Sequence, residues 1–165
     1  MKKIITSLLA SSLIMGIPIT HAADTSGKVM KTPQQIQWKE PYVKIPGEVK
    51  MAYLQGDPKK AGPYTIRIKF PPHYQVAVHS LPKNETMTVL SGTLFFAFEN
   101  KQDKRKAHKL AAGSFVIEPA NTPYFRFTRD EETIIQVQGE GPRTITFSKD
   151  GGTTGPAKPE ADEKK

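Results

Sequence analysis

The sequence predicts an all-β domain arranged as a sandwich or a barrel. Three observations favour this class. Apolar and polar residues alternate along nearly every central segment, turn residues separate those segments at intervals of roughly ten residues, and no useful length of the chain after its N-terminal apolar run has a helical period. Many short strands with this spacing are typical of two-layer or closed β architectures.

The first 23 residues have the pattern of a secretory signal peptide. Lys2 and Lys3 precede a short apolar run, and small residues allow cleavage near Ala22 or Ala23. Because the run is too short to span a bilayer stably, we expect no stable membrane anchor. The mature protein is therefore expected to be periplasmic or secreted. The chain has no cysteine, so burial rather than disulfide bonding must stabilise its fold.

Three parts follow the signal peptide. Residues 24–44 are polar apart from one large anchor, Trp38, and are expected to form an N-terminal arm. Residues 45–148 hold the alternating segments and form the predicted barrel. Residues 149–165 are rich in Gly, Pro, Lys and Glu and are expected to be disordered. Strands are predicted near 49–54, 64–70, 86–91, 93–98, 114–118, 124–128, 133–138 and 143–147.

The charge of the chain does not indicate a nucleic-acid partner. There are 24 Lys and Arg residues against 16 Asp and Glu residues, and removal of Lys2 and Lys3 leaves a formal charge of about +6. The basic residues are dispersed, and no helix or aromatic platform organises them. The one concentrated run, over 100–109, is expected to be a solvated hairpin loop.

Two short motifs make the fold prediction more specific. "HSLPKNE", residues 79–85, is followed seven positions later by Gly92, and Gly113 is followed by "PANTPY", which ends at Tyr124. This pair resembles the two conserved motifs of the cupin superfamily, and residues 45–148 resemble exported single-domain bacterial cupins. The resemblance implies an RmlC-like jelly roll, the cupin-type double-stranded β-helix, in which both motifs together bind one metal through three histidines and a glutamate.

The metal-binding positions of the resemblance are only partly retained. His79 matches the first histidine and Glu85 the glutamate, but Leu81 replaces the second histidine and Tyr124 the third. Leucine has no lone pair to donate, and a tyrosine with a pKa near 10 binds a divalent metal poorly at neutral pH. Gln138 occupies a position that often carries another histidine in related sequences, and it offers only a carbonyl oxygen.

We therefore expect a degenerate metal site and no cofactor. Any cofactor that is bound should be a single divalent metal (Zn, Mn, Fe or Ni) held by His79, Glu85 and Tyr124. His79 and Glu85 can equally be a hydrogen-bonded remnant inside the barrel. Strand parity places Tyr124 and Arg126 on the same face, and a lumen lined by these four residues suits a small polar or anionic ligand.

The preferred hypothesis is an exported, metal-poor cupin that binds a small molecule or a partner in its barrel, without redox chemistry. The candidate ligand-binding residues are His79, Leu81, Glu85, Tyr124, Arg126 and Gln138. The alternative is a metal-dependent enzyme of dioxygenase, isomerase or lyase type, and a purely structural interaction module is a third option. Neither a cysteine nor a serine in a strand-to-helix turn is available as a nucleophile, so no catalytic residue is assigned. The resemblance also allows a homodimer.

Overall fold

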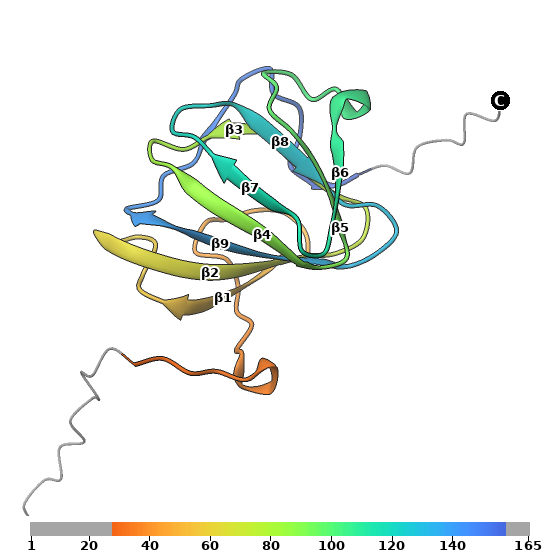
Figure 1. The fold of residues 1–165 in the computed structure, drawn as a ribbon. Coiled ribbons are helices and arrows are strands. Elements are labelled where there is room, and N and C mark those ends of the chain that lie inside the picture. The colour runs from red at the N-terminus through yellow and green to blue at the C-terminus, as the bar shows by residue number, and fades with distance from the viewer. Residues whose placement is uncertain (1–27, 158–165) are drawn as a thin grey trace, which may run out of the picture.

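The computed structural model describes residues 28–157, so the expected signal peptide lies outside the described residues. Apart from two short 3₁₀ turns, all regular secondary structure of the described part consists of antiparallel strands (Figure 1). Within it, no helix has the length and apolar character needed to cross a membrane. The elements in chain order are η1 (Pro33–Gln35), β1 (Lys50–Gln55), β2 (Gly62–Phe70), β3 (Tyr74–Ser80), β4 (Glu85–Ser91), β5 (Thr93–Ala97), η2 (Lys104–Lys106), β6 (His108–Ala111), β7 (Phe115–Glu118), β8 (Tyr124–Phe127), β9 (Thr133–Gly141), β10 (Thr146–Phe147) and β11 (Gly155–Pro156).

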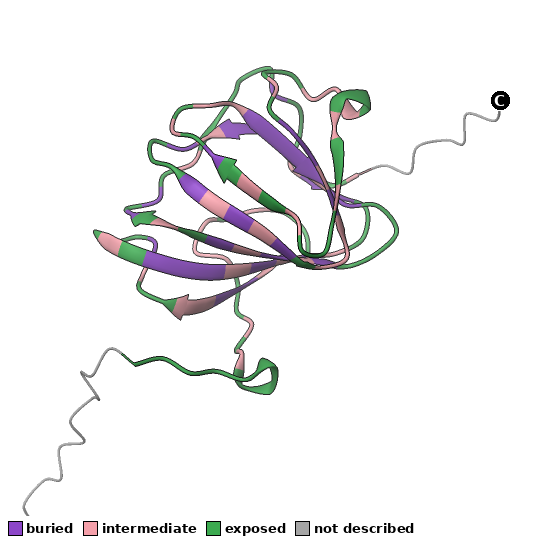
Figure 2. Cartoon of the chain, in the orientation of Figure 1, coloured by how far each residue is buried: buried purple, intermediate pink, exposed green. Residues whose placement is uncertain are grey.

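The strands form two sheets that face each other. One sheet has the order β1-β2-β9-β4-β7, and the other has the order β10-β3-β8-β5-β6, with β11 also pairing with β3. Because side chains alternate across each strand, every second residue points between the sheets. Figure 2 shows that the buried residues are concentrated on these strands. The interior is filled by an apolar cluster: Val49, Met51, Tyr64, Ile66, Ile68, Phe70, Tyr74, Leu81, Met87, Val89, Leu94, Phe96, Tyr124, Ile135 and Val137.

The predicted strands are present, with three additions. β3, β6 and β11 were not predicted as strands, and the segment expected at 143–147 is regular only over β10. Its first residue, Arg143, turns out of the sheet and donates its backbone N–H to the carbonyl of Pro58 at 2.6 Å. This departure from regular pairing allows the Arg143 side chain to enter the barrel.

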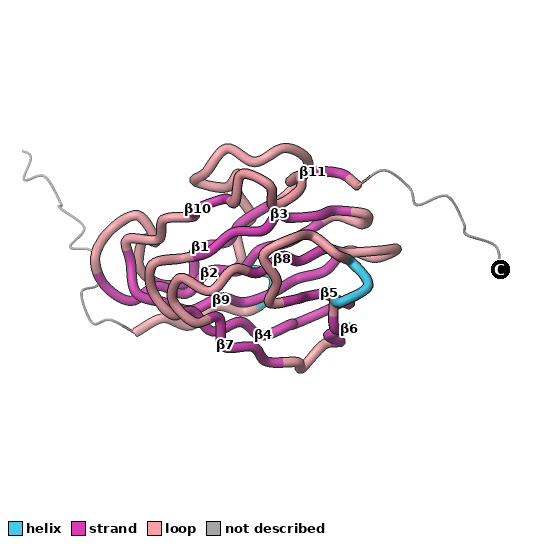
Figure 3. Tube along the Cα trace, turned by 90° about the horizontal axis from the view of Figure 1, so that it is seen from above, coloured by secondary structure: helices cyan, strands magenta, loops and turns pink. Residues whose placement is uncertain are grey.

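The two terminal segments differ in how they attach. The arm is mostly exposed up to Glu40, and its backbone pairs with the sheet at an isolated bridge between Lys39 and Met51. The prediction that the C-terminal part is disordered from residue 149 was wrong for residues 149–157, because they bond to the edge of β3 (Figure 3). Val78 donates to the carbonyl of Gly151 at 2.8 Å. A side chain at 151 would clash with Val78, so a glycine suits this close approach.

Candidate functional site

The two motif loops meet at one end of the barrel. The backbone N–H of Asn121 donates to the carbonyl of Leu81 at 2.7 Å, and that of Ala120 donates to Oδ1 of Asn84 at 2.8 Å. Asn121 has a φ of 58°, a left-handed conformation that asparagine tolerates better than most residues. His79 and Tyr124 are register partners on β3 and β8, and their ring centroids are 4.4 Å apart. The motif residues predicted to converge therefore do so.

A row of inward-facing positions crosses the first sheet next to these loops. Tyr64 on β2, Gly139 on β9, Glu85 on β4 and Glu118 on β7 are consecutive register partners. The hydroxyl of Tyr64 donates to Oε1 of Glu85 across Gly139. A Cβ at position 139 would lie 2.6 Å from that hydroxyl oxygen, so the contact depends on a glycine between the two side chains.

Arg143 forms a bidentate ion pair with Glu85. Its Nε donates to Oε1 at 2.7 Å and its Nη2 to Oε2 at 3.2 Å, while Nη1 reaches the hydroxyl of Tyr42 at 3.3 Å. Both side chains of the pair are almost fully buried, with exposed fractions of 3% and 2%. Burial, the largest single influence, lowers the pKa of Arg143, but Glu85, Tyr42 and Tyr124 together outweigh it, and the pKa is raised well above its usual value. Arg143 is therefore a permanent cation beside Glu85.

A second, looser ion pair joins Arg126 to Glu118. Nη1 of Arg126 lies 3.4 Å from Oε1 of Glu118, and both side chains are buried. Among the described residues, neither carboxylate oxygen of Glu118 has a hydrogen-bond partner. Arg126 instead donates to Sδ of Met87 at 3.3 Å and to the hydroxyl of Tyr124 at 3.1 Å. Its charge is paired, but its hydrogen bonds go to weak neutral acceptors.

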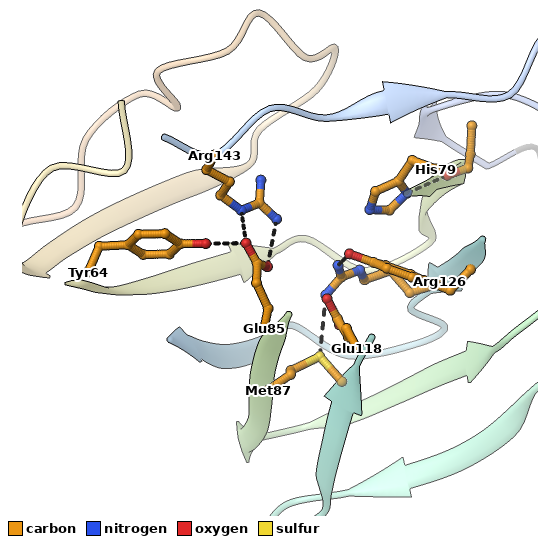
Figure 4. Close-up of polar contacts among 9 residues, drawn as sticks. Tyr64, His79, Glu85, Met87, Glu118, Arg126 and Arg143 are labelled. Atoms are coloured by element: carbon orange, nitrogen blue, oxygen red, sulfur yellow. Dashed lines mark hydrogen bonds and ion pairs between the residues drawn. The ribbon is translucent and has the colours of Figure 1, made fainter. Parts of the chain in front are cut away.

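His79 is a neutral side chain inside this arrangement. Its Nδ1 lies 2.7 Å from the carbonyl oxygen of Ala77. Burial, and next the positive charge of Arg126, lower the pKa of His79 to about 3. Because a carbonyl can only accept, Nδ1 must carry the proton in the neutral ring, and Nε2 keeps a lone pair. Figure 4 shows the His79 ring, Arg126 and Arg143 directed toward a common space.

A small cavity of about 40 Å³ opens between these polar groups and an apolar wall. His79, Arg126 and Arg143 are on its polar side, and Thr154 comes from the C-terminal segment. Val43 from the arm, Ile45 directly after it and Phe147 from β10 contribute to its lining. The remaining lining residues are Met51, Ile68, Phe70, Val76 and Ile145. The cavity is therefore formed jointly by the barrel and both terminal segments.

The structure places the predicted site residues as follows. His79, Glu85, Tyr124 and Arg126 lie together in the interior, and Leu81 is buried in the apolar cluster. Gln138 does not join them: it is exposed, because its neighbour Val137 takes the inward position on β9. The prediction that Gln138 is a ligand-binding residue was therefore wrong.

Three important residues were missed from the sequence: Tyr64, Glu118 and Arg143. Glu118 ends a four-residue strand whose other residues are all apolar, so alternation gives no signal for its burial. Arg143 follows the end of β9, where alternation gives no direction for a side chain.

The donor set does not fit a divalent metal in the position that the resemblance implies. Oε1 of Glu85 accepts hydrogen bonds from Arg143 and Tyr64, and Oε2 accepts one from Arg143. Tyr124 accepts a hydrogen bond, and burial followed by the charge of Glu118 raises its pKa well above 10, so it remains a phenol. Across residues 28–157, no group of three or more His, Cys, Asp or Glu side chains is placed to hold a metal ion. Catalytic zinc and the iron facial triad use three protein ligands.

The chain is similar in structure to several solved proteins of low sequence identity. The polyketide cyclase RemF from Streptomyces resistomycificus is 15% identical with a TM-score of 0.59, over 74% of this chain and 88% of that chain. The DMSP lyase DddQ from Ruegeria pomeroyi DSS-3 is 18% identical with a TM-score of 0.56, over 72% of this chain and 64% of that chain. An RmlC-like cupin from Shewanella frigidimarina NCIMB 400 is 14% identical with a TM-score of 0.52, over 67% of this chain and 87% of that chain.

These similarities concern the fold alone, and together with the strand order they confirm a cupin-type jelly-roll barrel. The comparison with curated proteins gave no match. The chain belongs to the family described as "Domain of unknown function (DUF4437)", whose model matches residues 20–145. The match includes every residue of the two ion pairs, whereas the C-terminal segment from Thr146 onward lies beyond it.

Proposed function

We propose that this protein is a metal-independent binding protein that holds a small molecule inside its barrel. The pairing of Glu85 with Arg143 carries the proposal. A metal could use Glu85 only after displacing a buried guanidinium that makes two charge-assisted hydrogen bonds. Breaking a buried ion pair by removing one partner costs about 3–5 kcal/mol, so the ion would have to supply at least that much. The guanidinium therefore provides the positive charge that a metal provides in a complete cupin site.

The cavity beside the ion pairs supports a binding role. Two arginines, a neutral histidine and Thr154 line a space whose other lining residues are apolar. Ligand sites commonly combine an apolar lining with a few polar groups that fix orientation. At about 40 Å³, this cavity accepts only a very small molecule unless the arm or the C-terminal segment moves.

Metal content provides the test of this proposal. The mature protein is purified without chelator and its transition metals are measured by elemental analysis, with Glu85→Gln as a variant and the exposed-site change Gln138→Ala as a control. The expected content is far below one equivalent in all three proteins. Near one equivalent in the wild type, retained in the control and lost in Glu85→Gln, would overturn the proposal.

We also propose that the protein acts outside the cytoplasm. The supporting features are Lys2, Lys3, the apolar run that follows them, and the small residues near Ala22 and Ala23. Intact mass measured on protein from a periplasmic fraction should correspond to cleavage at one of these alanines. Full-length protein found only in the cytoplasm would contradict this.

One observation favours the alternative of a metal-dependent enzyme of dioxygenase, isomerase or lyase type. The Nδ1 proton of His79 is held by a backbone carbonyl, and this leaves Nε2 available, as is usual for metal-binding histidines. Titration with Co²⁺ separates the two proposals, because a stoichiometric site gives visible absorption bands. Bands that appear in the wild type and vanish in His79→Ala would favour the enzyme.

A further inference from the structure

The unused hydrogen-bonding groups of the cavity define the chemistry of its ligand. We infer that the cavity binds a small neutral carbonyl compound that also carries a hydrogen-bond donor, such as a primary amide or an α-hydroxycarbonyl compound. The carbonyl oxygen accepts from Arg126, and the donor group reaches Nε2 of His79. This inference rests on the proposed function, because a metal bound to His79 would occupy the same lone pair.

Arg126 has N–H groups that make no hydrogen bond to a described residue. A guanidinium carries five N–H groups, and Arg126 uses one on each Nη atom, toward Met87 and Tyr124. No partner among the described residues accepts from its Nε, and no hydrogen bond joins it to Glu118 at 3.4 Å. Arg143, in contrast, has committed its Nε and Nη2 to Glu85. Arg126 is therefore the cavity cation with the greater capacity for an oxygen acceptor from a ligand.

His79 supplies the complementary acceptor. The Nδ1 proton is held by Ala77, and Nε2 has no hydrogen-bond partner within residues 28–157. Nε2 is not among the fully buried atoms that lack a partner, so it keeps some accessible surface. Because His79 lines the cavity, a ligand O–H or N–H can donate to this nitrogen. Since His79 and Arg126 line the same cavity, one small molecule can satisfy both.

The charges of the site favour a neutral ligand over an anion. Arg126 and Arg143 are each paired with a glutamate, and His79 is neutral, so the interior charges already cancel. A bound carboxylate would add a third buried negative charge with no counterion of its own, and burying an uncompensated charge is strongly unfavourable. The lumen was expected to suit a polar or anionic ligand, and the ion pairs narrow this expectation to neutral polar ligands.

The size of the cavity sets the scale of the ligand. Its 40 Å³ is room for about three water molecules, so the ligand can have only a few non-hydrogen atoms. Acetamide, acetone and acetate each have four such atoms and nearly the same shape. They differ in their hydrogen-bonding groups and in their charge. Acetamide has an acceptor and a donor, acetone has an acceptor alone, and acetate carries a negative charge.

The experiment is a titration of the metal-free, ¹⁵N-labelled mature protein with each of the three compounds, followed by NMR. We expect acetamide to shift the amide signals around His79 and Arg126 and to bind at least about fivefold more tightly than acetone, because of one additional hydrogen bond. Acetate should bind more weakly than acetamide. Tighter binding of acetate, equal binding of all three, or no shift with any of them would overturn the inference.

Two variants assign the contacts. His79→Phe keeps an aromatic ring but removes the acceptor, so acetamide should lose its advantage over acetone, whereas the exposed-site control His108→Phe should keep it. The double variant Arg126→Met with Glu118→Gln removes both charges of the loose pair, so it leaves no unpaired ion. It should weaken the binding of acetamide and acetone alike, and unchanged affinities would overturn the role of Arg126.

The two proposals fail in different ways. If the wild type contains nearly one equivalent of metal, the proposed function fails before any ligand is added. If the protein is free of metal but does not prefer acetamide, the proposed function stands and the inferred ligand class is wrong.

Discussion

Arg143 donates to both carboxylate oxygens of Glu85, the one metal-binding carboxylate that the cupin motifs of this chain retain. The two residues are 58 positions apart in the sequence and meet inside the barrel. Tyr64 and Tyr42 hydrogen-bond to the outer sides of the pair. In a complete cupin motif the glutamate binds a metal ion, whereas in this chain Glu85 binds the guanidinium of Arg143.

Removing the guanidinium should destabilise the fold strongly. Arg143→Met leaves Glu85 buried without a counterion, and we expect a loss of about 3–5 kcal/mol in the free energy of unfolding. The double variant Arg143→Met with Glu85→Gln should recover much of this loss, because no buried charge remains. Denaturant unfolding measures both. Arg105→Met, which removes an exposed ion pair, is the control and should cost no more than about 1 kcal/mol.

Gly139 should be required for the contact between Tyr64 and Glu85. A Cβ at this position would lie 2.6 Å from the Tyr64 hydroxyl oxygen and 3.1 Å from Cγ of Glu85, so Gly139→Ala should cost about 1–3 kcal/mol of stability. Adding Tyr64→Phe removes the atom that clashes and should restore part of that loss. The neighbouring change Gln138→Ala, on the exposed face, should stay within about 0.5 kcal/mol. If Gly139→Ala also changes the free energy of unfolding by less than about 0.5 kcal/mol, Tyr64 and Glu85 do not pack across Gly139 as described.

Stability should fall with acidification because of His79. Its pKa is about 3 in the folded protein and near 6.5 in the unfolded chain. At pH values between these two, only the unfolded state takes up the proton. The contribution of His79 is therefore complete above about pH 6.5 and is lost toward pH 3, at up to about 1.4 kcal/mol per pH unit.

The test of this pH dependence is a comparison of unfolding free energies from pH 7 to pH 4. His79→Gln should flatten the wild-type curve in this range, and the exposed-site change His108→Gln should not. Carboxylates titrate over the same range, so the difference between wild type and variant is the relevant quantity. Parallel curves for all three proteins would mean that the pKa of His79 is the same in the folded and unfolded states, which would contradict the prediction.

The fold was predictable because its signals are local. Alternation identified most of the strands, and the two motifs identified the turns that bring His79 and Tyr124 together. Alternation also had the information to exclude Gln138, since Ile135 and Val137 already fill the inward positions of β9. β3 was harder, because a register irregularity between Val76 and His79 changes which residues face inward.

The ion pairs of the site were not predictable in the same way. Arg143 lies in an irregular segment whose direction is set by a backbone hydrogen bond to Pro58, a contact between distant parts of the chain. Glu118 stands at the end of an edge strand, where a charged residue is ordinarily solvated. Its burial depends on Arg126 from a strand of the opposite sheet. Ion pairs between distant segments or opposite sheets depend on the tertiary structure, so local sequence patterns do not predict them.

A metal site should be recoverable only if Arg143 is also removed. The double change Leu81→His with Tyr124→His supplies two imidazoles next to His79, but Glu85 stays bonded to the guanidinium and the positive charge of Arg143 remains close by. Adding Arg143→Ala frees the carboxylate and removes that charge, while the metal in turn neutralises the buried glutamate. We expect the triple variant to bind Zn²⁺ at least about tenfold more tightly than the double variant, a difference of about 1.4 kcal/mol. Competition against a zinc-binding dye measures both affinities, with Leu81→His, Tyr124→His and Arg105→Ala combined as the control for loss of a surface arginine. Equal affinities in the double and triple variants would show that Arg143 does not keep Glu85 from the metal.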